Sequence, residues 1–131
     1  MDDMQLVNAA LNAMQYSYSP YSKFKVGAAI LTDCGKIYTG CNVENASYGA
    51  AICAERCAAV KAISDGCTKF SKIAIISSSN TYTYPCGICR QFLSEFFLKE
   101  GIVCLYDQNN GIKTIPFWDL IPNAFTGECI E

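Results

Sequence analysis

Apolar residues recur at helical spacing near the start of the chain and then give way to short apolar runs. Residues 4–15 are predicted to form an amphipathic helix, because their apolar side chains share one helical face. That face consists of Leu6, Val7, Ala10, Leu11 and Met14. Asp2 or Asp3 is the candidate N-cap, since a short acidic side chain accepts hydrogen bonds from first-turn amides, and Pro20 ends the segment.

Strands and helices alternate through the middle of the chain. Residues 25–31 and 36–42 are predicted strands that flank Asp33-Cys34-Gly35, which is typical of a hairpin turn. A polar loop is expected over residues 42–49. Residues 51–64 form a predicted helix that Gly66 closes. Residues 72–77 have the continuous apolar run of a buried strand.

The second half continues this alternation. A helix is predicted from Pro85 to about Lys99, because proline is favoured in a first helical turn, and Gly101 closes it. Residues 102–106 form a predicted strand, 109–111 a turn, and 113–131 a short strand, a helical turn and a loop. This order predicts one α/β domain over residues 1–131, with helices on both faces of a mixed sheet that has parallel members.

Composition limits the chemistry that this domain can perform. The 131-residue chain has nine cysteines and no histidine. Without histidine, the chain alone cannot build a Ser-His-Asp or Cys-His catalytic group, or a His-ligated metal site. A metal in this protein must therefore be held by cysteine thiolates and carboxylates. The odd number of cysteines and a start without signal-peptide features favour reduced thiols in the cytoplasm.

The charge pattern argues against a polyanionic partner. Ten basic and twelve acidic residues give a formal net charge of −2, and the basic residues are scattered along the chain. Nucleic-acid-binding domains instead have a basic excess or stripe. No apolar run approaches the roughly 20 residues that a membrane-spanning helix needs. We therefore expect neither nucleic acid nor a membrane as a partner.

Two short segments combine residue types that carry chemistry, each at a predicted helix start. They are residues 53–56 (Cys-Ala-Glu-Arg) and residues 85–89 (Pro-Cys-Gly-Ile-Cys). Side chains lean toward the N-terminus of a helix, so Cys53, Cys86 and Cys89 are expected to converge just beyond two helix ends. The helix dipoles favour thiolates there. Three cysteines and one open position are typical of a catalytic zinc site.

The same two segments match the three-cysteine form of the zinc-deaminase signature, in which Pro-Cys-x-x-Cys follows Cys-x-Glu. The chain resembles the small, homotetrameric type of cytidine deaminase over nearly its whole length. Further matching segments are residues 18–22, 24–29, 40–48 and 120–125, although the usual glycine of the last segment is Asn123 here. The resemblance implies a three-layer α/β/α fold around a mixed, roughly five-stranded sheet.

The resemblance implies one Zn²⁺ per chain, held by Cys53, Cys86 and Cys89. Bound zinc lowers the pKa of a water molecule. Glu55, which is not a ligand, would move protons from that water to the pyrimidine ring and the departing ammonia. Arg56 would donate hydrogen bonds to thiolate sulfur and offset the surplus negative charge of the ligands. The implied reaction converts cytidine and deoxycytidine to uridine and deoxyuridine, in pyrimidine salvage.

The resemblance also assigns contacts with the substrate. Phe24 would pack against the pyrimidine ring, and the backbone at Ala54 would bind the base carbonyl. Asn42 and Glu44 would hydrogen-bond the ribose 3′-hydroxyl. A site built to hydrogen-bond a hydroxyl rejects ligands that lack it, because its own polar groups would stay unpaired. None of these residues binds phosphate, so a free nucleoside is the expected substrate.

A homotetramer with shared sites follows from the same resemblance. Ala46 and Tyr48 would approach the 5′-hydroxyl from a neighbouring subunit, and Phe125 would close the site from another. Only 17% of the residues are charged, below the average of about 25%, which agrees with surface buried between subunits.

Other interpretations explain part of the pattern. Cys86-Gly87-Ile88-Cys89 also resembles a thiol–disulfide oxidoreductase motif, which leaves Cys53 and Glu55 without a role. The three cysteines also suit a zinc-binding module without turnover. Deaminases of a nucleoside antibiotic, a nucleotide or RNA share the metal site. Cys57 is a rival ligand, but the Cys-x-Glu pair begins at Cys53. The other cysteines are interpreted as small apolar residues: Cys34, Cys41, Cys57, Cys67, Cys104 and Cys129.

Overall fold

The computed structural model describes residues 1–130, and Glu131, the end of the predicted tail and domain, lies outside them. Its helices and strands are α1 (Asp3–Met14), β1 (Val26–Thr32), β2 (Ile37–Cys41), α2 (Ala54–Ser64), β3 (Phe70–Ser77), α3 (Gly87–Ser94), β4 (Phe97–Asp107) and β5 (Gly111–Pro116). Three short 3-10 helices are η1 (Tyr48–Ala50), η2 (Phe117–Leu120) and η3 (Gly127–Ile130).

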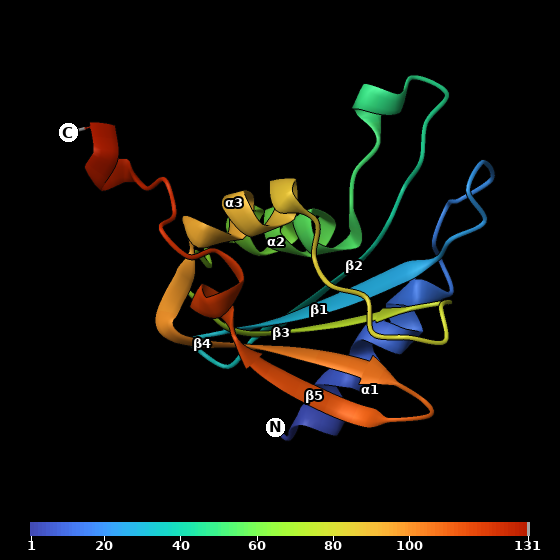
Figure 1. Cartoon of the computed structure of the whole chain (residues 1–131), viewed down its shortest axis with the longest axis horizontal. Helices are drawn as coiled ribbons and strands as arrows, with labels where there is room; N and C mark the ends of the chain where they lie inside the picture. The colour runs from blue at the N-terminus through green and yellow to red at the C-terminus, as the bar shows by residue number, and fades with distance from the viewer. Residues whose placement is uncertain (131) are drawn as a thin grey trace.

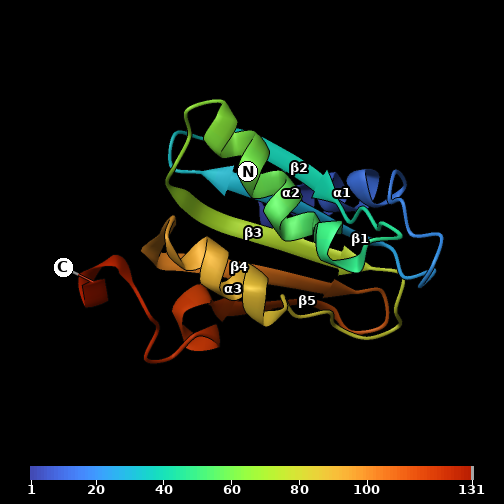
Figure 2. The same ribbon diagram turned by 90° about the horizontal axis from the view of Figure 1, so that it is seen from above.

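The strands form one mixed sheet in the order β2-β1-β3-β4-β5. β3 and β4 are parallel and joined through α3, and the other neighbouring pairs are antiparallel. Figures 1 and 2 show α1 on one face of the sheet, with α2 and α3 on the other. The predicted mixed five-stranded sheet between two helical layers is therefore confirmed.

Both faces of the central strands are buried, because each face has its own apolar core. Ala28 and Ile30 of β1 belong to the core under α2 and α3, whereas the intervening Ala29 belongs to the core under α1. Successive side chains of a strand point to opposite faces, so a strand buried on both sides is continuously apolar. This explains the uninterrupted apolar runs in the sequence.

The first helix begins where its capping residues predict. The backbone amide of Gln5 donates to Asp2 Oδ1 at 2.8 Å, and the amide of Asp2 donates to Gln5 Oε1 at 2.9 Å. This reciprocal capping box satisfies two amides that the helix leaves without partners. Asp2 is therefore the N-cap, and the predicted helix 4–15 is confirmed with each bound shifted by one residue.

Two helix predictions need correction. The helix predicted from residue 51 begins at Ala54, because residues 51–53 are extended and Ile52 forms a bridge with Val43. The helix predicted to reach Lys99 ends at Ser94, and β4 already begins at Phe97. Pairing with β3 at Phe70 and stacking of Phe97 on the Phe117 ring, with centroids 4.3 Å apart, overrode the local helical pattern.

Gly101 consequently lies inside β4 rather than at a helix end. A Cβ at this position would lie 2.3 Å from the ring of Phe97, so the absence of a side chain lets that ring pack against the strand. The register between β3 and β4 shifts in this region, which makes β4 bulge.

A glycine also determines how closely α2 approaches the sheet. A Cβ on Gly40 of β2 would lie 2.5 Å from the Ala58 nitrogen and 2.6 Å from the Ala54 carbonyl oxygen. The backbone of α2 therefore rests directly on the backbone of β2. Because Cys53 and Glu55 lie at the start of α2, this contact fixes their height above the sheet.

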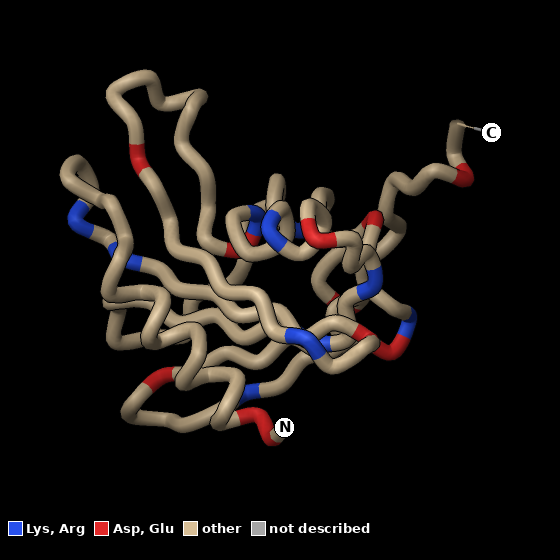
Figure 3. The backbone as a smooth tube through the Cα atoms, turned by 180° about the vertical axis from the view of Figure 1, so that it is seen from behind, with Lys and Arg blue, Asp and Glu red and all other residues tan. Residues whose placement is uncertain are grey.

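The charged residues do not gather on one face. Figure 3 shows Lys and Arg interspersed with Asp and Glu over the backbone seen from behind. Among residues 1–130, no helix has the length and apolar character needed to cross a lipid bilayer.

Candidate active site

Two of the three predicted metal ligands are N-cap residues of helices that start beside each other. Cys53 caps α2 and Cys86 caps α3, both with extended backbone and without a side-chain capping bond. N-caps are ordinarily Ser, Thr, Asp or Asn, whose oxygens bind first-turn amides. A thiol caps weakly, so both sulfur atoms remain available for another partner. Cys89 lies in the first turn of α3 and is fully buried.

The three thiols meet at one point. The Sγ atoms of Cys53, Cys86 and Cys89 all lie within 4.8 Å of one another, and those of Cys53 and Cys86 are 3.8 Å apart. Cys57 does not belong to this group, although its spacing made it a rival ligand. Soft thiolates at such mutual distances fit tetrahedral Zn²⁺, whose bonds to sulfur are about 2.3 Å long. The donor set leaves a fourth position for a water molecule or substrate.

Arg56 supplies positive charge to the cluster. Its guanidinium lies 3.6 Å from Cys53 Sγ, and its Nε is buried without a hydrogen-bond partner among residues 1–130. The neighbouring Cys89 thiol and the Arg56 guanidinium lower the pKa of Cys53 to about 5, against the opposing effect of burial. The hydrogen bond to Cys53, together with burial, raises the pKa of Cys89. The protein thus stabilises a thiolate before any metal binds.

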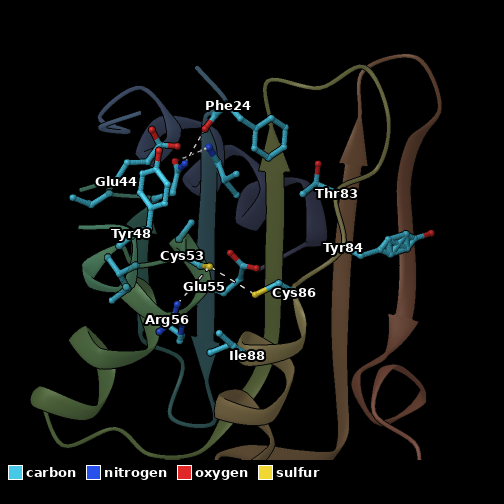
Figure 4. Close-up of a pocket in the computed structure, with 17 residues that line it drawn as sticks. Phe24, Glu44, Tyr48, Cys53, Glu55, Arg56, Thr83, Tyr84, Cys86 and Ile88 are labelled. Carbon is cyan, nitrogen blue, oxygen red and sulfur yellow. Dashed lines mark hydrogen bonds between the residues drawn. The ribbon is translucent and has the colours of Figure 1, made fainter. Parts of the chain in front are cut away.

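Glu55 lies beside the thiols but outside the cluster. Only 4% of Glu55 is exposed. Burial raises the pKa of its carboxyl to about 7; a hydrogen bond from its own backbone amide opposes the shift, and the negative charge of Cys53 adds to it. In Figure 4, its carboxylate lies next to the sulfur atoms of Cys53 and Cys86. The structure therefore brings the Glu55 carboxylate next to the thiol cluster (Figure 4).

An open cleft of about 440 Å³ leads to Glu55, within the range of small-molecule sites. Phe24 stands at one end of this cleft and Ile88 at the other (Figure 4). The cleft lies between the loop before β1, the 42–52 loop, and the first turns of α2 and α3. Its lining residues are Phe24, Val26, Asn42, Val43, Glu44, Tyr48, Gly49, Ala51, Ile52, Cys53, Ala54, Glu55, Arg56, Thr83, Tyr84, Cys86 and Ile88.

The side chain of Asn42 joins the two loops that flank the cleft. Its Nδ2 donates to the Phe24 carbonyl oxygen at 2.8 Å, and its Oδ1 accepts from the Val26 amide at 2.9 Å and from the Ser17 hydroxyl at 2.5 Å. One amide hydrogen remains for a ligand. Asn42 therefore positions the backbone from the Phe24 carbonyl to the Val26 amide.

Glu44 is held as a fixed acceptor. Its Oε1 accepts from the backbone amides of Tyr21 at 3.0 Å and Ser22 at 3.1 Å, and its Oε2 accepts from the Ser22 hydroxyl. The hydroxyl and then the amide of Ser22 hold the pKa of Glu44 below its ordinary value. An ionised carboxylate in a fixed orientation suits a ligand hydroxyl as donor.

The structure does not bring every predicted residue to this cleft. Tyr48 lines the cleft of its own chain while 81% exposed, whereas Ala46 and Phe125 lie outside the lining. Phe125 is 60% exposed, and Gln91 on α3 holds its carbonyl oxygen through a 2.9 Å hydrogen bond. Both Tyr48 and Phe125 therefore present apolar rings to the surroundings of the chain.

Several supporting residues were missed from the sequence. Ser17 and Ser22 orient Asn42 and Glu44, but these contacts join residues more than twenty positions apart. Arg90, in the first turn of α3, is another of these supporting residues. Its Nε donates to the Pro85 carbonyl oxygen at 2.8 Å and its guanidinium to the Leu120 carbonyl oxygen at 2.9 Å. Side chains lean toward the N-terminus of a helix. The position of Arg90 near the start of a predicted helix was therefore the one sequence feature that could have indicated its contact with Pro85.

A thiol cluster with an adjacent buried carboxylate, beneath an open cleft on an α/β/α scaffold, defines the class of zinc-dependent hydrolytic enzymes. Comparison with known proteins identifies the family. Residues 1–105 match the sequence model of the cytidine and deoxycytidylate deaminase zinc-binding region. The chain belongs to the cytidine deaminase family.

Relatives cover nearly the whole chain. A probable cytidine deaminase of Dictyostelium discoideum is 46% identical over 123 residues, which are 93% of this chain and 82% of that protein. A cytidine deaminase of Sporosarcina psychrophila is 41% identical over 98% of this chain and 94% of its own. The crystal structure of cytidine deaminase from Burkholderia pseudomallei has a TM-score of 0.90 at 41% identity and covers 95% of this chain and 100% of its own.

Proposed function

We propose that this chain catalyses the zinc-dependent hydrolysis of cytidine and deoxycytidine to uridine and deoxyuridine, with release of ammonia. The observation that carries this proposal is the convergence of Cys53, Cys86 and Cys89 beside the buried Glu55 at the floor of an open cleft. Membership of the cytidine deaminase family supports the same reaction. The redox alternative uses Cys86 and Cys89 alone, and gives no role to the adjacent Cys53 and Glu55.

In this proposal, the three thiolates hold one zinc ion per chain. Bound zinc supplies Lewis acidity that lowers the pKa of a water molecule in the cleft. Glu55 accepts a proton from the attacking water and delivers it to the pyrimidine ring nitrogen as a C–O bond forms at C4. Glu55 then takes the proton of the new C4 hydroxyl and transfers it to the amino group. The C4–N bond breaks, ammonia leaves, and C4 becomes the carbonyl carbon of the product.

Other cleft residues orient the substrate. Phe24 packs against the pyrimidine ring, and the backbone at Ala54 binds the base carbonyl. Glu44 and the free amide hydrogen of Asn42 bind the ribose 3′-hydroxyl, supported by the contacts that hold both side chains in place. Fixed polar groups avoid the entropic cost of ordering them at each turnover.

The chemistry of the cleft favours a free nucleoside over a nucleotide or a polynucleotide. Arg56 is the one basic side chain among its lining residues, and it faces the thiols. Glu44 repels a phosphate close to the ribose. We therefore expect cytidine and deoxycytidine to react, and cytidine monophosphate to have a kcat/KM lower by about tenfold or more.

One set of measurements tests the reaction. Zinc per chain is measured first, and ammonia release and the ultraviolet change are then followed with cytidine, deoxycytidine, cytidine monophosphate and a cytosine-containing RNA. About one zinc per chain and turnover of the two nucleosides are expected. Zinc without turnover supports a zinc-binding module instead. Absence of zinc with reversible oxidation of Cys86 and Cys89 supports an oxidoreductase.

We also propose that the chain acts as a single catalytic domain in a cytoplasmic homotetramer of pyrimidine salvage. The exposed rings of Tyr48 and Phe125, and the openness of the cleft, support completion of each site by neighbouring copies, with Ala46 approaching the 5′-hydroxyl. Nine free thiols support a reducing compartment. Sedimentation tests the assembly: a fully active monomer would contradict shared sites.

Arg56→Ala is expected to impair activity more than folding. Without the guanidinium, three thiolates leave zinc with one uncompensated negative charge, which weakens its Lewis acidity. We expect kcat or zinc affinity to fall by about 10- to 100-fold, with little change in the unfolding temperature of the zinc-free protein. Arg56→Lys keeps the charge but loses the planar fork, and should recover part of the loss. Unchanged turnover and zinc content in Arg56→Ala would contradict this role.

A further inference from the structure

A second pair of thiols faces each other at the end of the sheet away from the zinc cluster. Cys34 lies in the turn between β1 and β2, and Cys67 lies in the loop between α2 and β3. Their Sγ atoms are 3.9 Å apart, although 33 positions separate them in the sequence. Of the six cysteines interpreted as small apolar residues, only Cys104 is buried, and Cys34 is exposed, so packing does not account for Cys34.

Independent contacts hold the two segments together. The Asp33 amide donates to the Lys69 carbonyl oxygen at 3.0 Å, and the Lys36 ammonium lies 4.0 Å from the Asp65 carboxylate. The Tyr38 hydroxyl donates to the same carboxylate. The closeness of the two sulfur atoms therefore follows from the backbone and the side chains around them, not from a single rotamer.

The two thiols differ in access. Cys34 is exposed, whereas Cys67 is half-buried and packs against the core under α2. The Thr32 hydroxyl, 3.3 Å from Cys34 Sγ, and the Lys36 amide hold the pKa of Cys34 below its ordinary value. The Tyr38 hydroxyl lies 3.4 Å from Cys67 Sγ. A reagent from solution thus meets Cys34 first, with Cys67 directly behind it.

We propose that Cys34 and Cys67 form a thiol–disulfide modification site that a small organic disulfide, such as oxidised glutathione, converts to an intramolecular disulfide. The Cys34 thiolate attacks one sulfur of the oxidised glutathione, which forms a mixed disulfide and releases one glutathione thiolate. The Cys67 thiolate then attacks Cys34 Sγ and releases the second. The two cysteines lose two electrons and two protons, and oxidised glutathione gains them as two reduced molecules.

The bond demands little movement and leaves the cleft intact. Its sulfur atoms must approach from 3.9 Å to about 2.05 Å, which side-chain rotation in the exposed turn of Cys34 provides. The link joins the β1–β2 turn to the segment after α2, whereas Cys53 lies at the opposite end of α2, about 16 Å away along the helix. The bond should therefore stabilise the fold without altering turnover.

Peptide mapping tests the site directly, and its outcome does not depend on deaminase activity. Zinc-loaded protein is incubated with oxidised glutathione, alkylated and digested with trypsin. Residues 26–36 and 62–69 form peptides that each contain one cysteine, Cys34 or Cys67. We expect these two peptides to be linked in the wild type. Cys129, exposed and alone in the peptide after Lys113, should instead keep glutathione as a mixed disulfide.

Single variants separate the two steps. In Cys67→Ser, glutathione should stay on Cys34, because no second thiol displaces it. Oxidation should raise the unfolding temperature of the wild type by about 5 °C, and that of Cys34→Ser or Cys67→Ser not at all. Dithiothreitol should reverse the rise. The proposal is overturned if Cys34 of the wild type accumulates glutathione to the same extent as in Cys67→Ser, with no linked peptides.

Discussion

Replacing Glu55 by glutamine is expected to abolish turnover while zinc stays bound. The amide has nearly the same shape as the carboxylate, so it fits the same buried position, but it cannot accept and return a proton. A general acid–base group contributes about 10²- to 10⁴-fold to a rate, and we expect at least that loss in kcat. Ammonia release from cytidine measures turnover, and elemental analysis measures the metal.

Zinc retention follows from the geometry, since Glu55 is not part of the thiol cluster. The fold should also tolerate the change, because glutamine removes the cost of burying a carboxylate at a position that is 4% exposed. Glu95→Gln, on the exposed end of α3, is the matched control and should keep full activity. Turnover within about threefold of the wild type, with zinc present, would show that another group moves the protons.

The second large effect is expected from Cys89→Ala, which should lose both zinc and turnover. Cys89 is fully buried and contributes one of the three sulfur atoms, so its removal leaves too few ligands for a tightly bound ion. Zinc per chain should fall from about one to near zero, and activity below detection. The variant should also lose metal-linked stability, about 2.7 kcal/mol where free zinc exceeds its Kd a hundredfold.

Cys104→Ala separates ligand loss from packing loss. Cys104 on β4 is also fully buried, and it lies outside the cluster. Both variants remove one sulfur atom from a core, and each should lose about 1 kcal/mol of stability for that reason alone. Only Cys89→Ala should lose zinc. A chelator should therefore lower the unfolding temperature of Cys104→Ala and leave that of Cys89→Ala unchanged. Stoichiometric zinc in Cys89→Ala would refute the ligand assignment.

The parts of the fold that the sequence predicted well are those with a strong local pattern. α1 and the first three strands have regular apolar spacing and clear turn residues, and their bounds agree with the structure within about two residues. The start of β4 was wrong because Phe96, Phe97 and Leu98 suit a helix or a strand equally. Contacts with β3 and Phe117, remote in the sequence, decide between the two.

The candidate site divides in the same way. The thiols and Glu55 belong to short motifs whose spacing alone predicts convergence at two helix starts. Other residues orient the side chains that face the substrate, as Ser22 orients Glu44. They act across long sequence separations that no local motif encodes. The pairing of Cys34 with Cys67 has the same cause, since two distant loops bring these thiols together. The residues that carry the chemistry were therefore predictable from the sequence, whereas the distant residues that orient them were not.

The close approach of α2 to β2 at Gly40 keeps the start of α2, with Cys53 and Glu55, in place when core side chains change. Where a helix rests on a sheet through side chains, each substitution between them alters the spacing. Here two backbones touch, so neither the Ala58 nitrogen nor the Ala54 carbonyl oxygen can move closer to the strand. An apolar core substitution away from the thiols and Glu55 should therefore cost stability alone, whereas any side chain at position 40 would displace the start of α2.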